Sequence, residues 1–337
     1  MRNAFVLLAA IGTSLIATLA SAKDYKGAEI YSSDSYTYGR YEMRMRAAKG
    51  GGILSTFFTY KNGSEIGNTF WEEIDIEIYG KENASTWQSN IILGTSRPTE
   101  QNEKDHEVGG LGDAYHTYVI EWTPDYVAWF VDGVEARRIE GTSTVTSLVN
   151  PQSLRFNIWA SESVEWTGAW DDSVLPVYQF VNYIEYKPYD PTTKGFAETG
   201  GWRDDFNSFN EKFWNKANWT FESNRVDFSP ENVVVKDGIL VLALTKNNAL
   251  GFTGTPPADD GNSSSSATSS IAPSSSAASS AATSSAAPAS SAPAASSVAA
   301  ASSKPAAGGK SGGGGGGSFH WIGLLLLGGL VAARRVK

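Results

Sequence analysis

Four carboxylates lie close together in the segment FWEEIDIEIYG, residues 70–80. If this segment is a β-strand, alternate residues share a face, so Glu73, Asp75 and Glu77 point one way and three isoleucines point the other. Like charges on one strand face repel each other and resist burial. Chemistry is one reason to keep them there, and the pattern alone leaves a solvated strand face and a calcium site as alternatives.

The spacing of these carboxylates suits glycoside hydrolysis. Glu73 and Glu77 lie four residues apart, which is about 13 Å along an extended strand. A retaining glycosidase needs its two carboxyl groups about 5 to 5.5 Å apart, and two glutamates that lean together on a concave sheet close that gap. The shorter Asp75 stays clear of a substrate but can touch its neighbour.

The surrounding sequence is typical of a β domain, because short segments of alternating apolar and polar residues are separated by Gly, Asn, Asp and Pro. We expect strands over residues 38–47, 53–60, 73–79, 87–93, 116–123, 126–133, 154–160, 180–189 and 238–245. Turn signals between them include KNGS, TPDY, VDGV and KDGI. Many short strands in one domain of this size predict an all-β fold, a β-sandwich of the jelly-roll type.

Composition divides the chain into four parts. Residues 1–22 are typical of a signal peptide, with a basic start, an apolar core and ASA at the end. Residues 23–255 form the expected catalytic domain. Residues 256–311 are rich in Ser, Ala and Pro, which predicts a disordered linker. Residues 312–337 join six glycines, a short apolar run and a basic end, and they resemble a GlyGly-type sorting tail of Gram-negative bacteria, with a weak membrane anchor as the alternative.

Net charge and cysteine content limit the classes of ligand and metal site that the chain can have. The chain has no cysteine, which excludes a disulfide framework and a thiolate metal site. Its net charge of −9 disfavours nucleic acid and anionic polymers. A neutral ligand such as a glucan fits this balance better, and all but one of the 11 tryptophans lie between Trp71 and Trp219, where flat rings can support sugars. We expect an exported, extracellular or cell-surface monomer that meets a membrane only through its tail.

The motif WEEIDIEIYG resembles the signature of glycoside hydrolase family 16. The segments HTYVIEWTPDYVAWFVDGVEARR and LRFNIWASESVEWTG resemble further parts of that family's lichenases, the endo-β-1,3-1,4-glucanases, and the resemblance covers residues 24 to about 250. The segment beginning at Trp202 resembles the one that opens the domain in most lichenases. The resemblance therefore implies a circularly permuted jelly roll with a concave substrate cleft and a join at residues 190–201.

The resemblance also implies residue roles. Glu73 matches the nucleophile, Glu77 the general acid/base, and Asp75 the carboxylate that hydrogen-bonds the nucleophile. Matches to substrate-binding positions, with core packing as the alternative for each aromatic, are Glu29, Phe58, Tyr60, Asn62, Glu65, Trp71, Gln88, Asn90, Arg155, Asn157, Trp159, Trp166 and Trp219.

No cofactor is implied for the chemistry. A structural calcium ion is expected away from catalysis, held largely through carbonyl oxygens at Asn182, Asp205 and Gly238. Glu72 lies off the catalytic face and is expected to be solvated. The residues expected to be structural rather than functional are Trp122, Trp129, Trp214, His106 and His116.

The resemblance implies a retaining endo-hydrolase that cuts mixed-linkage β-1,3-1,4-glucan at β-1,4 bonds following a 3-O-substituted glucose. Family 16 β-1,3-glucanases usually carry one more residue between the second and third carboxylates, whereas EIDIE does not, so residues 73–77 should run without a bulge. The alternatives are a β-1,3-glucanase or xyloglucan-active member of the family, and a non-catalytic glucan-binding sandwich. Three like charges on one strand speak against the last.

Overall fold

The computed structural model of the protein describes residues 22–97 and 99–261. Nearly all of the predicted signal peptide, nearly all of the predicted linker and the whole predicted tail lie outside these described residues. None of the helices in the described ranges is long and apolar enough to cross a membrane.

The described part of the chain is all-β, as the sequence predicts. Its strands are β1 (Tyr25–Tyr36), β2 (Gly39–Arg46), β3 (Ile53–Tyr60), β4 (Trp71–Tyr79), β5 (Thr86–Gly94), β6 (Glu100–Gln101), β7 (Lys104–Glu107), β8 (His116–Trp122), β9 (Tyr126–Val131), β10 (Val134–Glu140), β11 (Gln152–Ala160), β12 (Val177–Asp190), β13 (Gly195–Phe196), β14 (Trp202–Asp204), β15 (Trp214–Lys216), β16 (Val226–Phe228), β17 (Val233–Lys236) and β18 (Ile239–Lys246). The helices are single turns: α1 (Ser143–Thr146), α2 (Val164–Thr167), η1 (Lys81–Asn83), η2 (Asp172–Val174) and η3 (Pro230–Asn232).

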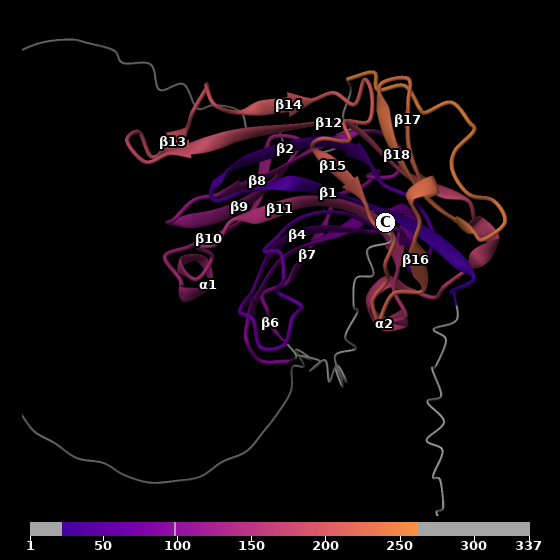
Figure 1. Ribbon diagram of the computed structural model, residues 1–337, viewed down its shortest axis with the longest axis horizontal. Coiled ribbons are helices and arrows are strands. Elements are labelled where there is room, and N and C mark those ends of the chain that lie inside the picture. Colours follow the sequence, from indigo (N-terminus) through magenta and orange to yellow (C-terminus); the bar gives the residue numbers. More distant parts are fainter. Residues whose placement is uncertain (1–21, 98, 262–337) are drawn as a thin grey trace, which may run out of the picture. The chain divides into compact units, whose positions relative to one another are not determined.

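The strands form two antiparallel layers. The first has the order β15–β1–β11–β3–β4–β5, and both β6 and β7 pair with β5. The second has the order β10–β9–β8–β2–β12, and the other edge of β12 pairs with β18 and then β14, with β17 beyond β18. Figure 1 shows β2, β8 and β12 in one curved layer and β1, β4 and β11 in the other. The start of β1 links the layers by pairing with β16 and β18.

The space between the layers is a packed apolar core. Ile74, Ile76 and Ile78 of β4 point into it and are fully buried, as alternation predicts. Two buried hydrogen bonds also join the layers, from Trp129 Nε1 to the Asp75 carbonyl and from Gln179 Nε2 to the Thr56 carbonyl, each 3.0 Å long. The predicted core positions of Trp122, Trp129 and Trp214 are confirmed, since each is at most 1% exposed.

All nine expected strands are present, and the turn signals between them explain their register. VDGV and KDGI each form a two-residue hairpin turn, with positive φ at Asp132 and Gly133 (49° and 78°) and at Asp237 and Gly238 (52° and 74°). Such turns need φ > 0 at both central residues, which Asp-Gly tolerates. The long strand β1 was missed, because the polar residues SSDSY in its second half hide its alternation.

The folded part continues beyond the predicted boundary at residue 255. The Arg44 guanidinium binds both carboxylate oxygens of Asp259 at 2.5 and 2.7 Å, and Tyr115 Oη donates to the Pro257 carbonyl at 3.1 Å. Phe252 packs against the rings of Tyr178 and Phe180 in the second layer. The first residues assigned to the linker are therefore part of the domain.

The expectation that Glu72 is solvated is wrong. Its side chain is fully buried and accepts hydrogen bonds from the backbone nitrogens of Val149 and Asn150 at 2.9 and 3.0 Å, and from the Asn150 side chain. Lys61 Nζ lies 3.5 Å from its other oxygen. Glu72 shares the core-facing side of β4, where the backbone of the 149–150 loop supplies donors that need an acceptor.

We predict that Glu72→Ala lowers the free energy of unfolding by about 3 kcal/mol, because it leaves Lys61 and two backbone N–H groups without their acceptor. Urea denaturation measures the change, and Glu107→Ala, at an exposed glutamate of β7, is the matched control. A loss no larger than that of the control would show that the buried carboxylate contributes nothing to stability.

Candidate active site

The outward face of β4 carries Glu73, Asp75 and Glu77 side by side, as predicted. Its pairing with β3 and β5 is unbroken along the strand, so the predicted absence of a bulge is confirmed. Each carboxylate therefore has a cross-strand neighbour on both sides: Tyr60 and Ile92 for Glu73, Phe58 and Asn90 for Asp75, Thr56 and Gln88 for Glu77. We call this surface the carboxylate face.

Glu73 is held by a tryptophan and by its carboxyl neighbour. Trp71 Nε1 donates to Glu73 Oε2 at 2.5 Å. Burial raises the pKa of Glu73 to about 7, while the hydrogen bonds from Trp71 and Asp75 oppose that rise. The pKa of Asp75 is raised well above its usual range, first by burial and then by the charges of Glu73 and Glu77. The neutral form of Asp75 is therefore favoured, and its hydrogen bond to the Glu73 carboxylate lowers the pKa of Glu73.

Glu77 is the second titrating group of the carboxylate face. Burial raises its pKa to about 8, and the negative charges of Glu73 and Asp105 add to the rise. The pKa values of both glutamates are therefore raised into the neutral range. Carboxyl groups that titrate near neutral pH are what acid and nucleophile roles in one site require.

Arg155 organises the neighbouring strands β11 and β1. Its Nη1 donates to Glu29 Oε1 at 2.9 Å and its Nη2 to Asn62 Oδ1 at 2.9 Å. Asn157 Nδ2 donates to the other oxygen of Glu29 at 3.1 Å. The guanidinium also lies over the Tyr60 ring, 4.4 Å from its centroid. Burial raises the pKa of Glu29, and the Arg155 charge opposes that rise.

The predicted polar residues at the two edges of the face are fixed by hydrogen bonds. Tyr60 Oη donates to Glu65 Oε2 at 2.6 Å. Asn90 Nδ2 donates to Gln101 Oε1 at 2.8 Å, and Asn90 Oδ1 accepts from the backbone nitrogen of Asn102 at 3.0 Å. These residues keep their side-chain directions before any substrate arrives.

Aromatic rings border the face on the side of β1 and α2. The ring centroids of Trp159 and Trp166 lie 5.8 Å apart, and those of Trp159 and Phe221 lie 5.0 Å apart. Trp219 packs against Tyr31 at 5.2 Å and remains 37% exposed. We call Trp159, Trp166, Trp219 and Phe221 the aromatic wall.

Two residues of the face were missed by sequence reasoning. Tyr79 Oη donates to Asp105 Oδ1 at 2.8 Å and accepts from Trp166 Nε1 at 2.9 Å, while Gln88 Nε2 also donates to Asp105 at 3.0 Å. Tyr79 continues the same alternation two positions after Glu77, so the strand pattern could have found it. Asp105 comes from the short strand β7, whose pairing with β5 has no local sequence signal.

The two histidines make structural contacts. His106 stacks on Trp87 with ring centroids 4.3 Å apart, and a ring nitrogen lies 2.9 Å from Ser89 Oγ. Burial lowers the pKa of His106 to about 4, so its ring is neutral near pH 7. His116 Nδ1 lies 2.7 Å from Asp132 Oδ2 in the second layer. Neither contact involves Glu73, Asp75 or Glu77.

The residues matched to a calcium site do not converge through their side chains. Asn182 Nδ2 donates to Asp259 at 2.8 Å, and Asp205 accepts from Arg203 Nε at 2.8 Å. Gly238 lies in the β17–β18 turn. Within the described ranges, no group of three or more His, Cys, Asp or Glu side chains is placed to hold a metal ion. These side chains do not fit a metal cluster, and calcium bound through carbonyl oxygens stays a prediction.

Comparisons with known proteins identify the family of the chain. Residues 10–174 match the model of "Glycosyl hydrolases family 16". A beta-glucanase of Fibrobacter succinogenes is 44% identical over 261 residues, which cover 75% of this chain and 73% of that protein. A beta-glucanase of Acetivibrio thermocellus is 38% identical over 169 residues, 49% of this chain and 46% of the relative. The solved structure of Bacillus licheniformis beta-glucanase is 34% identical, with a TM-score of 0.41, over 47% of this chain and 70% of that chain.

The fold and the paired carboxylates define a glycoside hydrolase. The chain belongs to glycosyl hydrolase family 16.

The raised pKa of Glu77 predicts a pH-dependent cost to stability. The folded state keeps this proton up to about pH 8, whereas the unfolded state loses it near pH 4.5. The folded state thus binds more protons in this window, and stability falls as pH rises through it. We expect Glu77→Gln to raise Tm, and to raise it more at pH 9 than at pH 5. Scanning calorimetry at both pH values tests this, with Glu107→Gln as the exposed control, and an equal gain at both would contradict it.

Proposed function

We propose that the protein is a retaining endo-hydrolase of mixed-linkage β-1,3-1,4-glucan, cutting β-1,4 bonds that follow a 3-O-substituted glucose. The observation that carries this proposal is the bulge-free strand β4, which presents Glu73, Asp75 and Glu77 on one face in unbroken register with β3 and β5. Relatives described as beta-glucanases support the same substrate class.

In the proposed mechanism Glu77 is the general acid. Its raised pKa keeps a proton available for the oxygen of the leaving sugar. Glu73 attacks the anomeric carbon and forms a glycosyl-enzyme, as the glycosidic bond breaks. Glu77, now ionised, takes a proton from water, which attacks the same carbon and releases the product with retained configuration.

Asp75 supports the nucleophile in this scheme. Its proton bonds to the Glu73 carboxylate in the free enzyme, which holds Glu73 in one orientation and limits its basicity. Trp71 Nε1 holds the same carboxylate from the other side. The nucleophile is therefore oriented before the reaction begins, which lowers the entropic part of the activation free energy.

The polar and aromatic surroundings suit a neutral polysaccharide. The amides of Asn62, Gln88 and Asn90 offer hydrogen bonds without net charge, and the aromatic wall offers flat surfaces for sugar rings. Trp159 and Trp166 lie in the lichenase-like segment LRFNIWASESVEWTG, which covers most of β11 and helix α2. This segment favours mixed-linkage glucan over xyloglucan.

We also propose that the protein is exported and reaches the cell surface or medium through its C-terminal tail. The apolar N-terminal segment ending in ASA and the Gly-rich, apolar and basic end of the chain support this proposal. N-terminal sequencing of the secreted protein tests it, and a mature chain that retains residues 1–22 would contradict it.

The nucleophile assignment predicts a specific chemical rescue. Glu73→Ala should lower kcat by about 10⁴-fold while the circular dichroism spectrum stays unchanged. With an aryl β-glycoside of a glucan oligosaccharide, added azide should restore turnover and give the α-glycosyl azide, because azide attacks from the vacated side. Formation of the β-azide instead would exchange the roles of Glu73 and Glu77.

The substrate assignment predicts a clear product pattern. Barley β-glucan should be hydrolysed much faster than laminarin or xyloglucan, and should yield mainly a trisaccharide and a tetrasaccharide with β-1,3 bonds near their reducing ends. Reducing-sugar assays and chromatography of the products provide the measurement. Equal or faster hydrolysis of laminarin or xyloglucan would refute the mixed-linkage assignment while leaving the retaining mechanism intact.

A further inference from the structure

The segment that carries two residues of the aromatic wall has little regular structure of its own. Residues 218–223 are all exposed, and we call residues 218–224 the aromatic loop because they contain Trp219 and Phe221. An exposed loop with few buried contacts opens easily unless other groups hold its backbone. The positions of Trp219 and Phe221 in the aromatic wall therefore depend on the residues that hold this loop.

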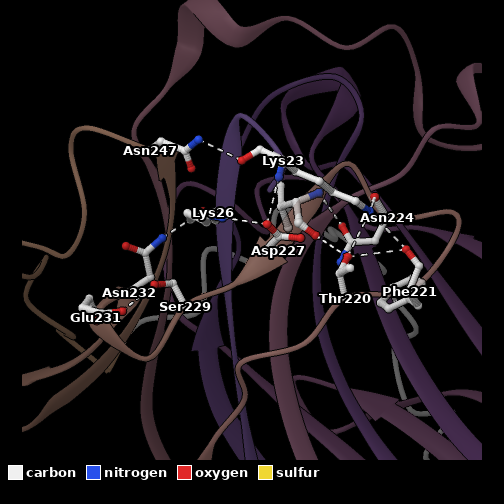
Figure 2. Close-up of polar contacts among 11 residues, drawn as sticks. Lys23, Lys26, Thr220, Phe221, Asn224, Asp227, Ser229, Glu231, Asn232 and Asn247 are labelled. Carbon is white, nitrogen blue, oxygen red and sulfur yellow. Dashed lines mark hydrogen bonds and ion pairs between the residues drawn. The ribbon is translucent and has the colours of Figure 1, made fainter. Parts of the chain in front are cut away.

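The first residue after the predicted signal peptide supplies several of these contacts. Lys23 Nζ donates to Thr220 Oγ1 at 3.0 Å, to the Phe221 carbonyl at 3.2 Å, and to the Asn224 carbonyl. Figure 2 shows the Lys23 side chain reaching these three residues. One ammonium group thus binds three acceptors along a single turn of the loop, which matches its three donors.

Lys23 is itself fixed on the side away from the loop. Its backbone nitrogen donates to Asp227 Oδ2 at 2.9 Å, and its carbonyl accepts from Asn247 Nδ2 at 2.8 Å (Figure 2). Asp227 lies on β16, which pairs in parallel with the start of β1. The lysine is therefore anchored to strands of the domain and can impose a position on the loop.

Other hydrogen bonds also hold the loop: most lie at its ends, and Thr220 Oγ1 donates to the Val226 carbonyl at 2.7 Å. The Trp219 carbonyl accepts from the Phe228 nitrogen at 2.8 Å, and the Ser223 carbonyl accepts from the Glu162 nitrogen at 3.1 Å. Between them, the Phe221 carbonyl accepts from the Asn224 nitrogen within the loop at 3.2 Å. Lys23 thus reaches the middle of the loop from outside it, next to Phe221, whose ring meets Trp159.

We propose that Lys23 is a positioning residue for substrate binding: its ammonium group holds the aromatic loop so that Trp219 and Phe221 complete the wall beside the carboxylate face. This rests on the proposed function, since it takes the wall as a glucan-binding surface. Lys23 touches no reacting atom, so its effect falls on the binding of long substrates and not on the chemical step.

The neighbouring Lys26 provides a matched control. Its Nζ forms an ion pair with the same Asp227 oxygen at 2.6 Å. Within the part of the chain that the structure describes, the side chain of Lys26 forms no hydrogen bond or ion pair with the aromatic loop. Lys23→Met and Lys26→Met therefore each remove one positive charge from the same end of the domain. Only Lys23→Met also removes the hydrogen bonds to the aromatic loop.

The test compares both variants with the unaltered full-length protein. Lys23→Met should raise KM for polymeric glucan by about two- to tenfold, the range given by loss of an aromatic contact, with kcat on a short aryl glycoside unchanged. Amide hydrogen exchange of residues 221–224 should quicken, and Lys23→Arg should restore both readings. Lys26→Met should leave KM and the exchange of these amides unchanged.

An unchanged KM and unchanged exchange in Lys23→Met, or the same changes in Lys26→Met, would overturn the proposal. The assay uses whichever β-glucan the unaltered protein hydrolyses fastest. A wrong mixed-linkage assignment would therefore show in the unaltered protein, whereas a wrong role for Lys23 would show only in the comparison of the variants.

Discussion

Strand β4 carries isoleucines on one face and carboxylates on the other, so its register decides whether the fold has a site at all. A shift of one residue would turn Glu73, Asp75 and Glu77 into the core and the isoleucines outward. The unbroken pairing with β3 and β5, the packing of three buried isoleucines, and the bond from Trp129 to the Asp75 carbonyl all oppose that shift. The core and the active site are thus specified by the same contacts.

The carboxylate face tolerates three neighbouring acids because they are not all charged. Burial favours the neutral form of each, the charges of Glu73 and Glu77 raise the pKa of Asp75, and the charge of Glu73 also raises the pKa of Glu77. Trp71 and Asp75 donate hydrogen bonds that offset part of the burial at Glu73. The same electrostatic cost that destabilises the folded state prepares one carboxyl group to donate a proton and another to attack.

The fold and much of the site could be predicted because they rest on local patterns. Strand alternation located Glu73, Asp75 and Glu77, and Asp-Gly pairs located two hairpin turns. Long-range pairing could not be read in this way, which is why Asp105 beside Gln88 was missed. Glu72 was misjudged from its charge, although alternation itself placed it on the buried face.

The calcium expectation rests on family resemblance and stays a prediction. It concerns carbonyl oxygens, whereas the side chains of Asn182 and Asp205 bind Asp259 and Arg203. Asp259 also lies beyond the boundary that composition suggested. Its pairing with Arg44 depends on where the chain folds back onto the second layer, and no local pattern in the sequence encodes that.

The most direct test of this account is a titration of the carboxyl carbons by ¹³C nuclear magnetic resonance, using protein labelled at glutamate and aspartate side chains. Variants Glu73→Gln, Asp75→Asn and Glu77→Gln assign the signals. The account predicts that Glu73 and Glu77 titrate well above the ordinary glutamate range, and that the pKa of Asp75 also lies well above the ordinary aspartate range. Titration of all three groups below pH 5 would contradict it.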